Sequence, residues 1–176
     1  FKLDIRKFYP SIDHDILKSI IRHKISDKAF LKIIYEIIDS ADGVPIGNYL
    51  SQYFANLYLT YFDHGLIVLK VKYYYRYADD IVIFYSNKEQ LHEWFKLIQR
   101  YLNENLKLTV KSNYQVFPIE SRGLDFVGYV FKHKYTLVRR TIKKNILQQV
   151  RRGKIDFSYL GWLKYCNSKL LLFRIE

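Results

Sequence analysis

The stretch that decides the fold runs from Tyr73 to Tyr85 and reads YYYRYADDIVIFY. Both of its ends are rich in aromatic and β-branched residues, which favour strands, so the stretch predicts a hairpin. Asp79 and Asp80 then lie at the hairpin tip, where two adjacent carboxylates are costly to keep ionised unless cations neutralise them. Divalent metal ions prefer oxygen ligands, and paired ions clamp the reacting oxygens of phosphoryl transfer. The stretch therefore favours metal-assisted chemistry on nucleotides, the alternative being an ordinary Asp-rich turn.

The composition narrows the class of protein. The chain has 176 residues and is 49% hydrophobic, which is enough for one good-sized core and excludes a disordered chain. The formal net charge of +12 indicates a polyanionic partner such as nucleic acid, although a solvated basic surface has the same excess. No apolar run reaches the roughly 18–20 residues of a membrane span, and no signal peptide is visible. The single cysteine, Cys166, excludes a disulfide within the chain and fits a reducing, cytoplasmic setting.

Hydrophobic spacing predicts an α+β fold, in which helices cover one face of a mostly antiparallel sheet. Ser26 is the expected cap of the second helix, and Asn87 is the expected cap of a later one. The expected strands lie at 1–5, in both halves of 73–85, and at 106–117, 124–131 and 135–138. The expected helices carry apolar residues over 12–21, 30–38, 50–61 and 91–102, followed by a helical tail broken near Gly153.

The chain contains no methionine, and Phe1 already lies in the first strand-like run, so we expect a piece of a longer protein. The composition turns sharply basic after residue 138, which predicts one domain over 1–138 and a second over 139–176. Seven cations and no acidic residue lie between Arg139 and Lys154, and this stretch is expected to neutralise phosphates. The aromatic residues of 158–165 are expected to pack a small helical core rather than to stack on bases.

Asp4 completes a first constellation. An aspartate in the middle of an apolar strand is disfavoured, and burying it without a partner is costly. If the first strand lies next to the hairpin, Asp4 comes to rest beside Asp79 and Asp80. The three carboxylates would form a site for two Mg²⁺ ions, of the kind that activates a 3′-hydroxyl and orients a triphosphate.

Four motifs, in this order, resemble those of the reverse transcriptase palm. They correspond to the first catalytic-aspartate motif, the loop and helix beside the incoming nucleotide, the polymerase signature box, and the hairpin that grips the primer end. In the sequence they read FKLDIRKFYPSI at 1–12, GVPIGNYLSQ at 43–52, YADD at 77–80 and GLDFVGY at 123–129. The resemblance covers nearly the whole chain. It implies a polymerase palm with a primer-grip-like hairpin over 1–138, part of a basic helical thumb over 139–176, and upstream fingers that are absent from this chain.

The resemblance also implies metal ligands. Asp4 and Asp79 would hold the ions, with Asp80 as an outer or second ligand and the backbone of Ile5 beside them. The implied cofactor is Mg²⁺, two ions per site, with Mn²⁺ as a substitute.

The backbone from Ile5 to Phe8 would lie along the triphosphate, where Arg6 and Lys7 add positive charge. The alternative for Arg6 and Lys7 is a solvated basic pair. Tyr9, five residues after Asp4, matches the steric gate whose ring fills the space of a ribose 2′-hydroxyl. The alternative for Tyr9 is a core tyrosine.

Ile46 is the main departure from the family pattern, because many reverse transcriptases have glutamine before Gly47. Isoleucine cannot support the nucleotide and its pairing with template through a hydrogen bond. Together with Asn48 and the Ser51-Gln52 pair, this loop resembles that of diversity-generating retroelements, which implies error-prone copying, especially opposite template adenine. The alternative is an apolar loop anchor with normal fidelity.

Lys111, after the run Leu106-Lys107-Leu108, is the candidate general acid for the leaving pyrophosphate, although its spacing differs from the commoner pattern. The alternative is a solvated lysine on a strand edge. The implied partners are an RNA template, a DNA primer, deoxynucleotides and a small basic accessory protein, with no membrane. A group II intron maturase, a phage-defence reverse transcriptase and a catalytically idle nucleic-acid-binding palm remain the rival functions.

Overall fold

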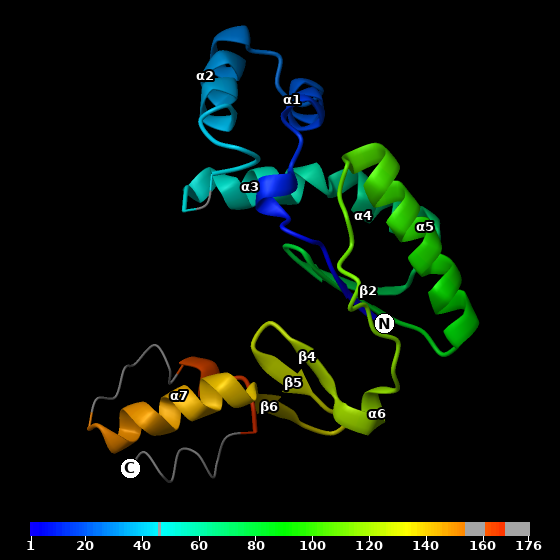
Figure 1. The fold of residues 1–176 in the computed structure, drawn as a ribbon, viewed down its shortest axis with the longest axis vertical. Helices are drawn as coiled ribbons and strands as arrows, with labels where there is room; N and C mark the ends of the chain where they lie inside the picture. Colours follow the sequence, from blue (N-terminus) through cyan, green and yellow to red (C-terminus); the bar gives the residue numbers. More distant parts are fainter. Residues whose placement is uncertain (46, 154–160, 168–176) are drawn as a thin grey trace. The chain divides into compact units, whose positions relative to one another are not determined.

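The computed structural model describes residues 1–45, 47–153 and 161–167, which divide into two compact units, 1–116 and 117–176 (Figure 1). Both units combine helices with antiparallel strands, so the predicted α+β class is confirmed. Within the described ranges, every helix is too short or too polar to cross a membrane.

The first unit is built on a three-stranded antiparallel sheet with the order β1-β3-β2. The strands are β1 (Lys2–Asp4), β2 (Tyr73–Tyr77) and β3 (Asp80–Phe84). β2 and β3 form the predicted hairpin, and β1 pairs with β3 in the register that sets Asp4 opposite Asp80. Two segments that are far apart in the sequence thus become neighbours at one end of the sheet.

The two faces of this sheet differ in chemistry. Leu3, Ile81 and Ile83 lie on one face and are fully buried in the main hydrophobic core. Because side chains alternate along a strand, Asp4 and Asp80 lie on the opposite face. The register therefore keeps the acidic side chains out of the core.

Five helices and a short 3₁₀ turn complete the first unit (Figure 1). Their apolar faces join the sheet in one core, whose fully buried members include Leu17, Ile38, Tyr58, Leu66 and Ile98. The elements are η1 (Tyr9–Ser11), α1 (His14–Arg22), α2 (Lys28–Ile38), α3 (Tyr49–Tyr58), α4 (Thr60–Val68) and α5 (Lys88–Leu106).

The helix ends confirm one predicted cap and correct another. The side chain of Asn87 accepts a hydrogen bond from the Gln90 amide and caps α5, as predicted. The expected Ser26 cap is wrong, because Asp27 caps α2 by accepting from the Phe30 amide at 2.9 Å. A carboxylate at this position also favours the positive end of the helix dipole.

Three predicted elements differ from the structure, since the strand expected over 124–131 is two strands, Leu124–Phe126 and Tyr129–Phe131, that pair across a turn. The helix expected over 50–61 is two helices, since the backbone departs from helical geometry at Leu59 between α3 and α4. The strand expected over 106–117 is absent, because α5 continues to Leu106 and the following chain makes only two isolated bridges, Ile5 with Val110 and Lys2 with Gln115. Between these bridges the second segment has more residues than the first, so part of it loops out and the ladder is interrupted.

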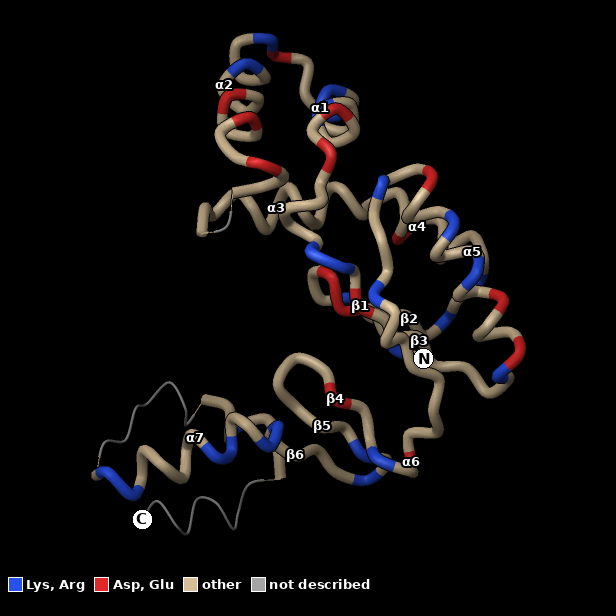
Figure 2. Tube along the Cα trace, in the orientation of Figure 1, with Lys and Arg blue, Asp and Glu red and all other residues tan. Residues whose placement is uncertain are grey.

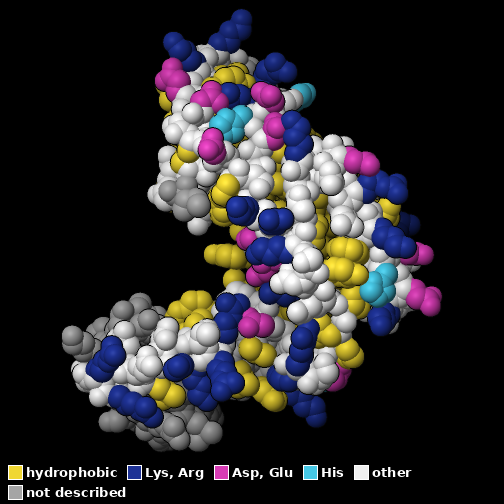
Figure 3. All heavy atoms as spheres, in the orientation of Figure 1, with side chains coloured by type: hydrophobic (Ala, Val, Ile, Leu, Met, Phe, Trp, Pro, Cys, Tyr) yellow, Lys and Arg dark blue, Asp and Glu magenta, His cyan; other side chains and the backbone are white. Residues whose placement is uncertain are grey.

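The second unit combines a three-stranded meander with a basic helix. Its elements are α6 (Ile119–Arg122), β4 (Leu124–Phe126), β5 (Tyr129–Phe131), β6 (Thr136–Val138) and α7 (Arg140–Arg151). Lys and Arg residues lie along α7, which carries no acidic residue (Figures 2 and 3). The break expected near Gly153 is consistent with the end of α7 at Arg151 and the positive φ of Gly153, while 154–160 lie outside the described residues.

The units divide between Val116 and Phe117, and not at residue 138, where the composition changes. Val138 of β6 packs with Ile146 of α7 and with Leu163 in one small core. The Tyr129 hydroxyl donates to the Trp162 carbonyl at 3.1 Å, and the two rings lie 5.4 Å apart. The meander therefore shares its core with the basic helix; Leu163 is a core residue, and Trp162 is half-buried beside Tyr129.

Candidate active site

The tip of the β2–β3 hairpin is a two-residue turn, because Tyr77 pairs with Asp80 and leaves Ala78 and Asp79 between them. Ala78 has a φ of 51°, in the left-handed region that disfavours residues with a Cβ. The Asp79 carbonyl accepts a hydrogen bond from the Ile5 amide at 3.2 Å. The turn is thus joined to the end of β1 and presents Asp79 there.

The three candidate carboxylates lie at the same end of the sheet. Asp4 lies opposite Asp80 in the sheet, and Asp79 follows in the turn. The pKa of Asp79 is raised, first by burial and then by the negative charges of Asp4 and Asp80, while the backbone amide and Lys111 act in the opposite direction. Burial is the larger cause, the repulsion expected between adjacent carboxylates adds to it, and nearby cations oppose both.

Two lysines neutralise the outer carboxylates. Lys111 Nζ lies 2.6 Å from Asp4 Oδ1, and Lys2 Nζ lies 3.3 Å from Asp80 Oδ1. The ion pair with Asp4 raises the pKa of the Lys111 ammonium. The backbone amide of Lys111 also donates to the Asp4 carbonyl at 2.8 Å. Lys111 is therefore part of the site rather than a solvated edge lysine, and Figure 2 shows basic and acidic segments meeting at the end of β1.

The donor set suits a hard divalent cation. Asp4 Oδ1 is buried and is in contact with the Lys111 ammonium at 2.6 Å, so an ion that displaced this lysine would gain a buried carboxylate oxygen as a ligand. In the arrangement that the described residues adopt, no group of three acidic, His or Cys side chains is close enough to enclose an ion. With Lys111 and Lys2 in contact with Asp4 and Asp80, binding an ion requires these ammonium groups to move aside.

The segment after Asp4 brings Tyr9 to the same site. The Ile5 and Phe8 side chains are buried, whereas Arg6 and Lys7 are exposed. Lys7 has a φ of 45°, which turns the chain sharply.

Tyr9 is half-buried beyond that turn. Burial raises the pKa of its hydroxyl, and the charges of Asp79 and Tyr77 raise it further. The Tyr9 hydroxyl therefore lies within electrostatic reach of the Ala78–Asp79 turn.

A loop that the sequence did not single out for this purpose fixes the Tyr9 backbone. The Val44 amide donates to the Tyr9 carbonyl at 3.0 Å. Gly43 has a φ of 67° and packs so closely that an added Cβ would overlap the Tyr9 carbonyl oxygen and the Pro10 backbone. Only glycine fits both the conformation and the space.

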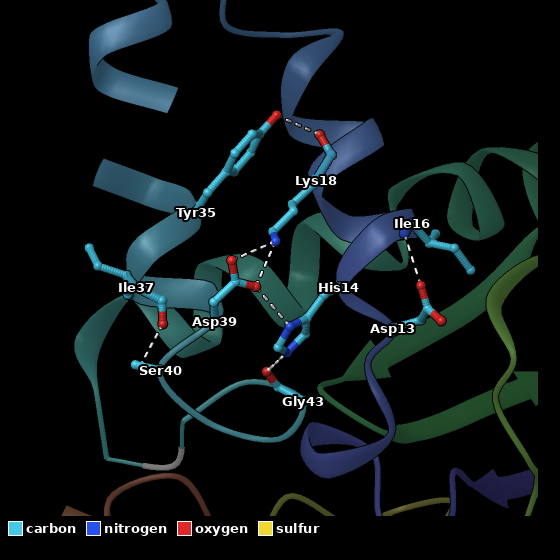
Figure 4. A network of polar contacts seen from close by, with 9 residues as sticks. All are labelled: Asp13, His14, Ile16, Lys18, Tyr35, Ile37, Asp39, Ser40 and Gly43. Atoms are coloured by element: carbon cyan, nitrogen blue, oxygen red, sulfur yellow. Dashed lines mark hydrogen bonds and ion pairs between the residues drawn. The ribbon is translucent and has the colours of Figure 1, made fainter. Parts of the chain in front are cut away.

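A polar network holds this loop from the other side (Figure 4). One ring nitrogen of His14 contacts the Gly43 carbonyl at 2.7 Å, and the other contacts Asp39 at 3.1 Å. Lys18 donates to both Asp39 oxygens at 2.6 and 2.7 Å, and it is the main cause of the lowered pKa of Asp39. His14 thus links α1 and, through Asp39, the end of α2 to the loop that holds Tyr9.

The remaining nucleotide-loop candidates are less constrained. Ile46 lies outside the described residues. Gly47 is exposed with a φ of 95°, and Gln52 is exposed on α3. The Ser51 hydroxyl is buried and donates to the Pro45 carbonyl, which anchors the start of α3 to the loop. Within the described part of this motif, Ser51 is therefore structural.

The sequence reading also missed an ion pair behind the hairpin. Arg76 of β2 binds the Asp63 carboxylate of α4 through two nitrogens, Nε at 2.9 Å and Nη2 at 2.6 Å. The sequence feature that could have revealed this ion pair is an arginine inside a tyrosine-rich strand, since a cation on the inner side of a sheet needs a fixed partner.

The hairpin that resembles the primer grip is present in the second unit. β4 and β5 pair through a two-residue turn, Val127-Gly128, in which both residues have positive φ. A positive φ is uncommon for a β-branched residue such as Val127 and marks a constrained turn. Gly128 is required at its position because an added Cβ would overlap the Trp162 ring.

Comparison with known proteins agrees with this geometry. The chain is similar to the COX1/OXI3 intron 2 protein of Saccharomyces cerevisiae, with 20% identity over 74% of this chain, and it spans 23% of that relative's length. The family model described as "Reverse transcriptase (RNA-dependent DNA polymerase)" matches residues 1–131, which include β1, the nucleotide loop, the catalytic hairpin and β4–β5. The chain belongs to the reverse transcriptase family.

Proposed function

We propose that the chain is the palm, with part of the thumb, of an RNA-directed DNA polymerase that acts through two divalent ions. The observation that carries this proposal is the register of β1 with β3, which sets Asp4 opposite Asp80 and next to Asp79. A surface that merely bound nucleic acid would gain nothing from three carboxylates close to phosphates. The formal charge of +12 fits a nucleic-acid partner.

Asp4, Asp79 and Asp80 would hold Mg²⁺ or Mn²⁺, with the Ile5 backbone beside them. When bound, the ions supply Lewis-acid activation of the primer 3′-hydroxyl and neutralise the charge that develops on the triphosphate. The buried Asp4 Oδ1, which a lysine ammonium already contacts, is the feature of this site that favours such an ion.

The other site residues have roles that follow from their positions. Lys111 stays protonated because its pKa is raised, so it can donate a proton to the leaving pyrophosphate from beside Asp4. Arg6 and Lys7 are exposed and can pair with phosphate oxygens. Tyr9, fixed through its backbone by the loop at Gly43 and Val44, would exclude a ribose 2′-hydroxyl by overlap.

A primer-extension assay tests the proposal. The protein that carries this chain should extend a DNA primer on an RNA template with Mg²⁺, and Asp79→Ala should abolish extension. Asp42→Ala, which changes an exposed aspartate, is the matched control and should keep full activity. Nucleic-acid binding without extension by the wild-type protein would identify an idle palm and refute the proposal.

The finer assignment is to a diversity-generating retroelement, and it is supported by Ile46 and its neighbours Asn48, Ser51 and Gln52. Its partners would include a small basic accessory protein. The wild-type enzyme should misincorporate opposite template adenine, and Ile46→Gln should reduce this error. An unchanged error spectrum in Ile46→Gln would make Ile46 a loop anchor only.

A second candidate is an intron-type reverse transcriptase, which the similarity to a yeast intron protein favours. The two candidates differ in template and in fidelity. Accurate copying opposite adenine, together with specific binding to intron RNA, would select the intron type.

A further inference from the structure

Arg76, in the first unit (1–116), is a cation whose guanidinium is held by several hydrogen bonds. It lies on β2, two residues before the turn, and its side chain is 11% exposed. A guanidinium in such surroundings must be fully paired, because an unpaired buried charge is strongly destabilising. Its partners therefore indicate what it does.

Four of the five guanidinium N–H donors are used, and they reach three different elements. Two bind Asp63 of α4 in a bidentate pair, at 2.9 and 2.6 Å. Nη1 donates to the Asn56 side chain of α3 at 3.0 Å and to the Ala78 carbonyl at 3.2 Å. We call this set, Arg76 with Asn56, Asp63 and Ala78, the hairpin clamp.

The Ala78 contact is the one that concerns chemistry. Ala78 is in the left-handed region, a conformation that persists only where the surrounding structure holds it. Two hydrogen bonds hold the turn: Arg76 donates to the Ala78 carbonyl, and the Ile5 amide donates to the Asp79 carbonyl. Both peptide carbonyls of the turn are therefore fixed, and they set the direction in which Asp79 points.

Arg76 is poorly suited to the alternative role of binding a substrate phosphate. Its donors are committed to protein acceptors, and its side chain lies mostly away from solvent. Tyr74 adds a further bond to Asp63, from its hydroxyl at 2.6 Å. Tyr74 strengthens the Arg76–Asp63 ion pair without touching the turn. A Tyr74 variant therefore separates an effect on protein stability from an effect on the orientation of Asp79.

We propose that Arg76 is a positioning residue, which holds the Ala78–Asp79 turn through the hairpin clamp and thereby aims Asp79 at the metal ions. The effect of Arg76 on catalysis rests on the proposed two-metal function. The claim that Arg76 holds the turn does not depend on that function. Arg76 does not touch the substrate in this scheme. Its effect reaches the reaction through the orientation of one carboxylate.

The structural consequence is tested on the chain by amide hydrogen exchange of Ile5. Arg76→Lys keeps the positive charge but loses the planar guanidinium that reaches Asp63 and Ala78 at the same time. Local opening of the turn then becomes easier, so the amide of Ile5 should exchange about tenfold faster. Tyr74→Phe removes one bond from the same ion pair and should change Ile5 exchange less than about threefold. Asn56→Ala, at an exposed position of α3, should give an intermediate increase while folding normally.

The catalytic consequence is tested by titrating Mn²⁺ in primer extension with the protein that carries this chain. For Arg76→Lys the Mn²⁺ concentration that gives half-maximal extension should rise about tenfold, with partial rescue at high Mn²⁺. Tyr74→Phe, with a similar loss of thermal stability, should leave this concentration unchanged. A purely structural arginine would predict the same Mn²⁺ requirement for both variants.

The outcomes distinguish the two proposals. Equal Ile5 exchange in Arg76→Lys and wild type overturns the clamp, whatever the activity. An altered Ile5 exchange with an unaltered Mn²⁺ requirement also overturns the positioning role. A wild-type protein that neither binds Mn²⁺ nor extends a primer refutes the proposed function, while the Ile5 measurement still decides whether Arg76 holds the turn.

Discussion

Substituting Gly43 by alanine tests whether the loop beneath Tyr9 is as tightly fitted as the structure indicates. At Gly43 the backbone has a φ of 67°, and the ideal Cβ position lies 2.6 Å from Pro10 Cα and overlaps the Tyr9 carbonyl oxygen. Both neighbours are backbone atoms, so no flexible side chain can turn away. Either the loop or the 3₁₀ turn at Tyr9–Ser11 must shift.

The size of the effect follows from two contributions. The left-handed conformation costs an alanine about 1–2 kcal/mol, and forcing a methyl group into occupied space costs about 1–3 kcal/mol. The stiffer unfolded chain offsets this by about 0.4–1 kcal/mol. We therefore expect a net loss of ~3 kcal/mol, which for a chain of this size lowers Tm by roughly 6–12 °C.

The assay is thermal denaturation followed by far-UV circular dichroism, with two glycine controls. Gly47→Ala carries the conformational cost alone, because its φ is 95° and an added Cβ meets no atom within 4 Å. Gly65→Ala lies within α4 with open space around it, so it should raise Tm, since alanine stabilises a helix interior by roughly 1 kcal/mol relative to glycine. A Gly43→Ala chain that melts within 2 °C of wild type, or no lower than Gly47→Ala, would refute the argument from close packing.

Three further predictions concern charge. Asp79→Asn should leave the metal-free chain equally stable or more stable in thermal melts, because burial and the charges of Asp4 and Asp80 disfavour the ionised carboxylate. The same variant should show no Mn²⁺ binding in calorimetry. A clear loss of thermal stability would contradict this prediction. Burial raises the pKa of Tyr58 to about 12, so the unfolded chain loses this proton first, and stability should be lost as pH rises from about 10 to about 12. Urea titrations should show that Tyr58→Phe weakens this alkaline loss, and an identical slope in both proteins would exclude Tyr58 as its source. Lys111→Gln should bind Mn²⁺ more tightly, because the competing ammonium on Asp4 is gone, yet extend primers more slowly, and faster extension would rule out the general-acid role.

The carboxylates of the site could be predicted because each of them breaks a preference of its local sequence. An aspartate in an apolar strand and a second pair in a hairpin turn each violate a local preference, and the violations mark where cations are needed. The Asn87 cap and the β2–β3 hairpin depend on residues close together in the chain, and both are confirmed. The reverse transcriptase family follows from the same motifs and is confirmed over residues 1–131.

The misses have a common cause in long-range contacts. The strand expected after Leu106 is absent because the left-handed Lys107 ends α5 there, and extra residues between two bridges interrupt its pairing with β1. The boundary expected at residue 138 moved because Val138 packs with α7, a contact that composition does not report.

The sequence by itself determined the α+β class, the hairpin with its carboxylates, and the family, since these depend on periodicity and on residues adjacent in the chain. Only the tertiary structure decided which groups stand around that hairpin. It put Lys111 on Asp4, Arg76 behind Ala78, and His14 beneath the loop that holds Tyr9. These contacts join residues from different elements, and their geometry exists only after the helices have packed on the sheet.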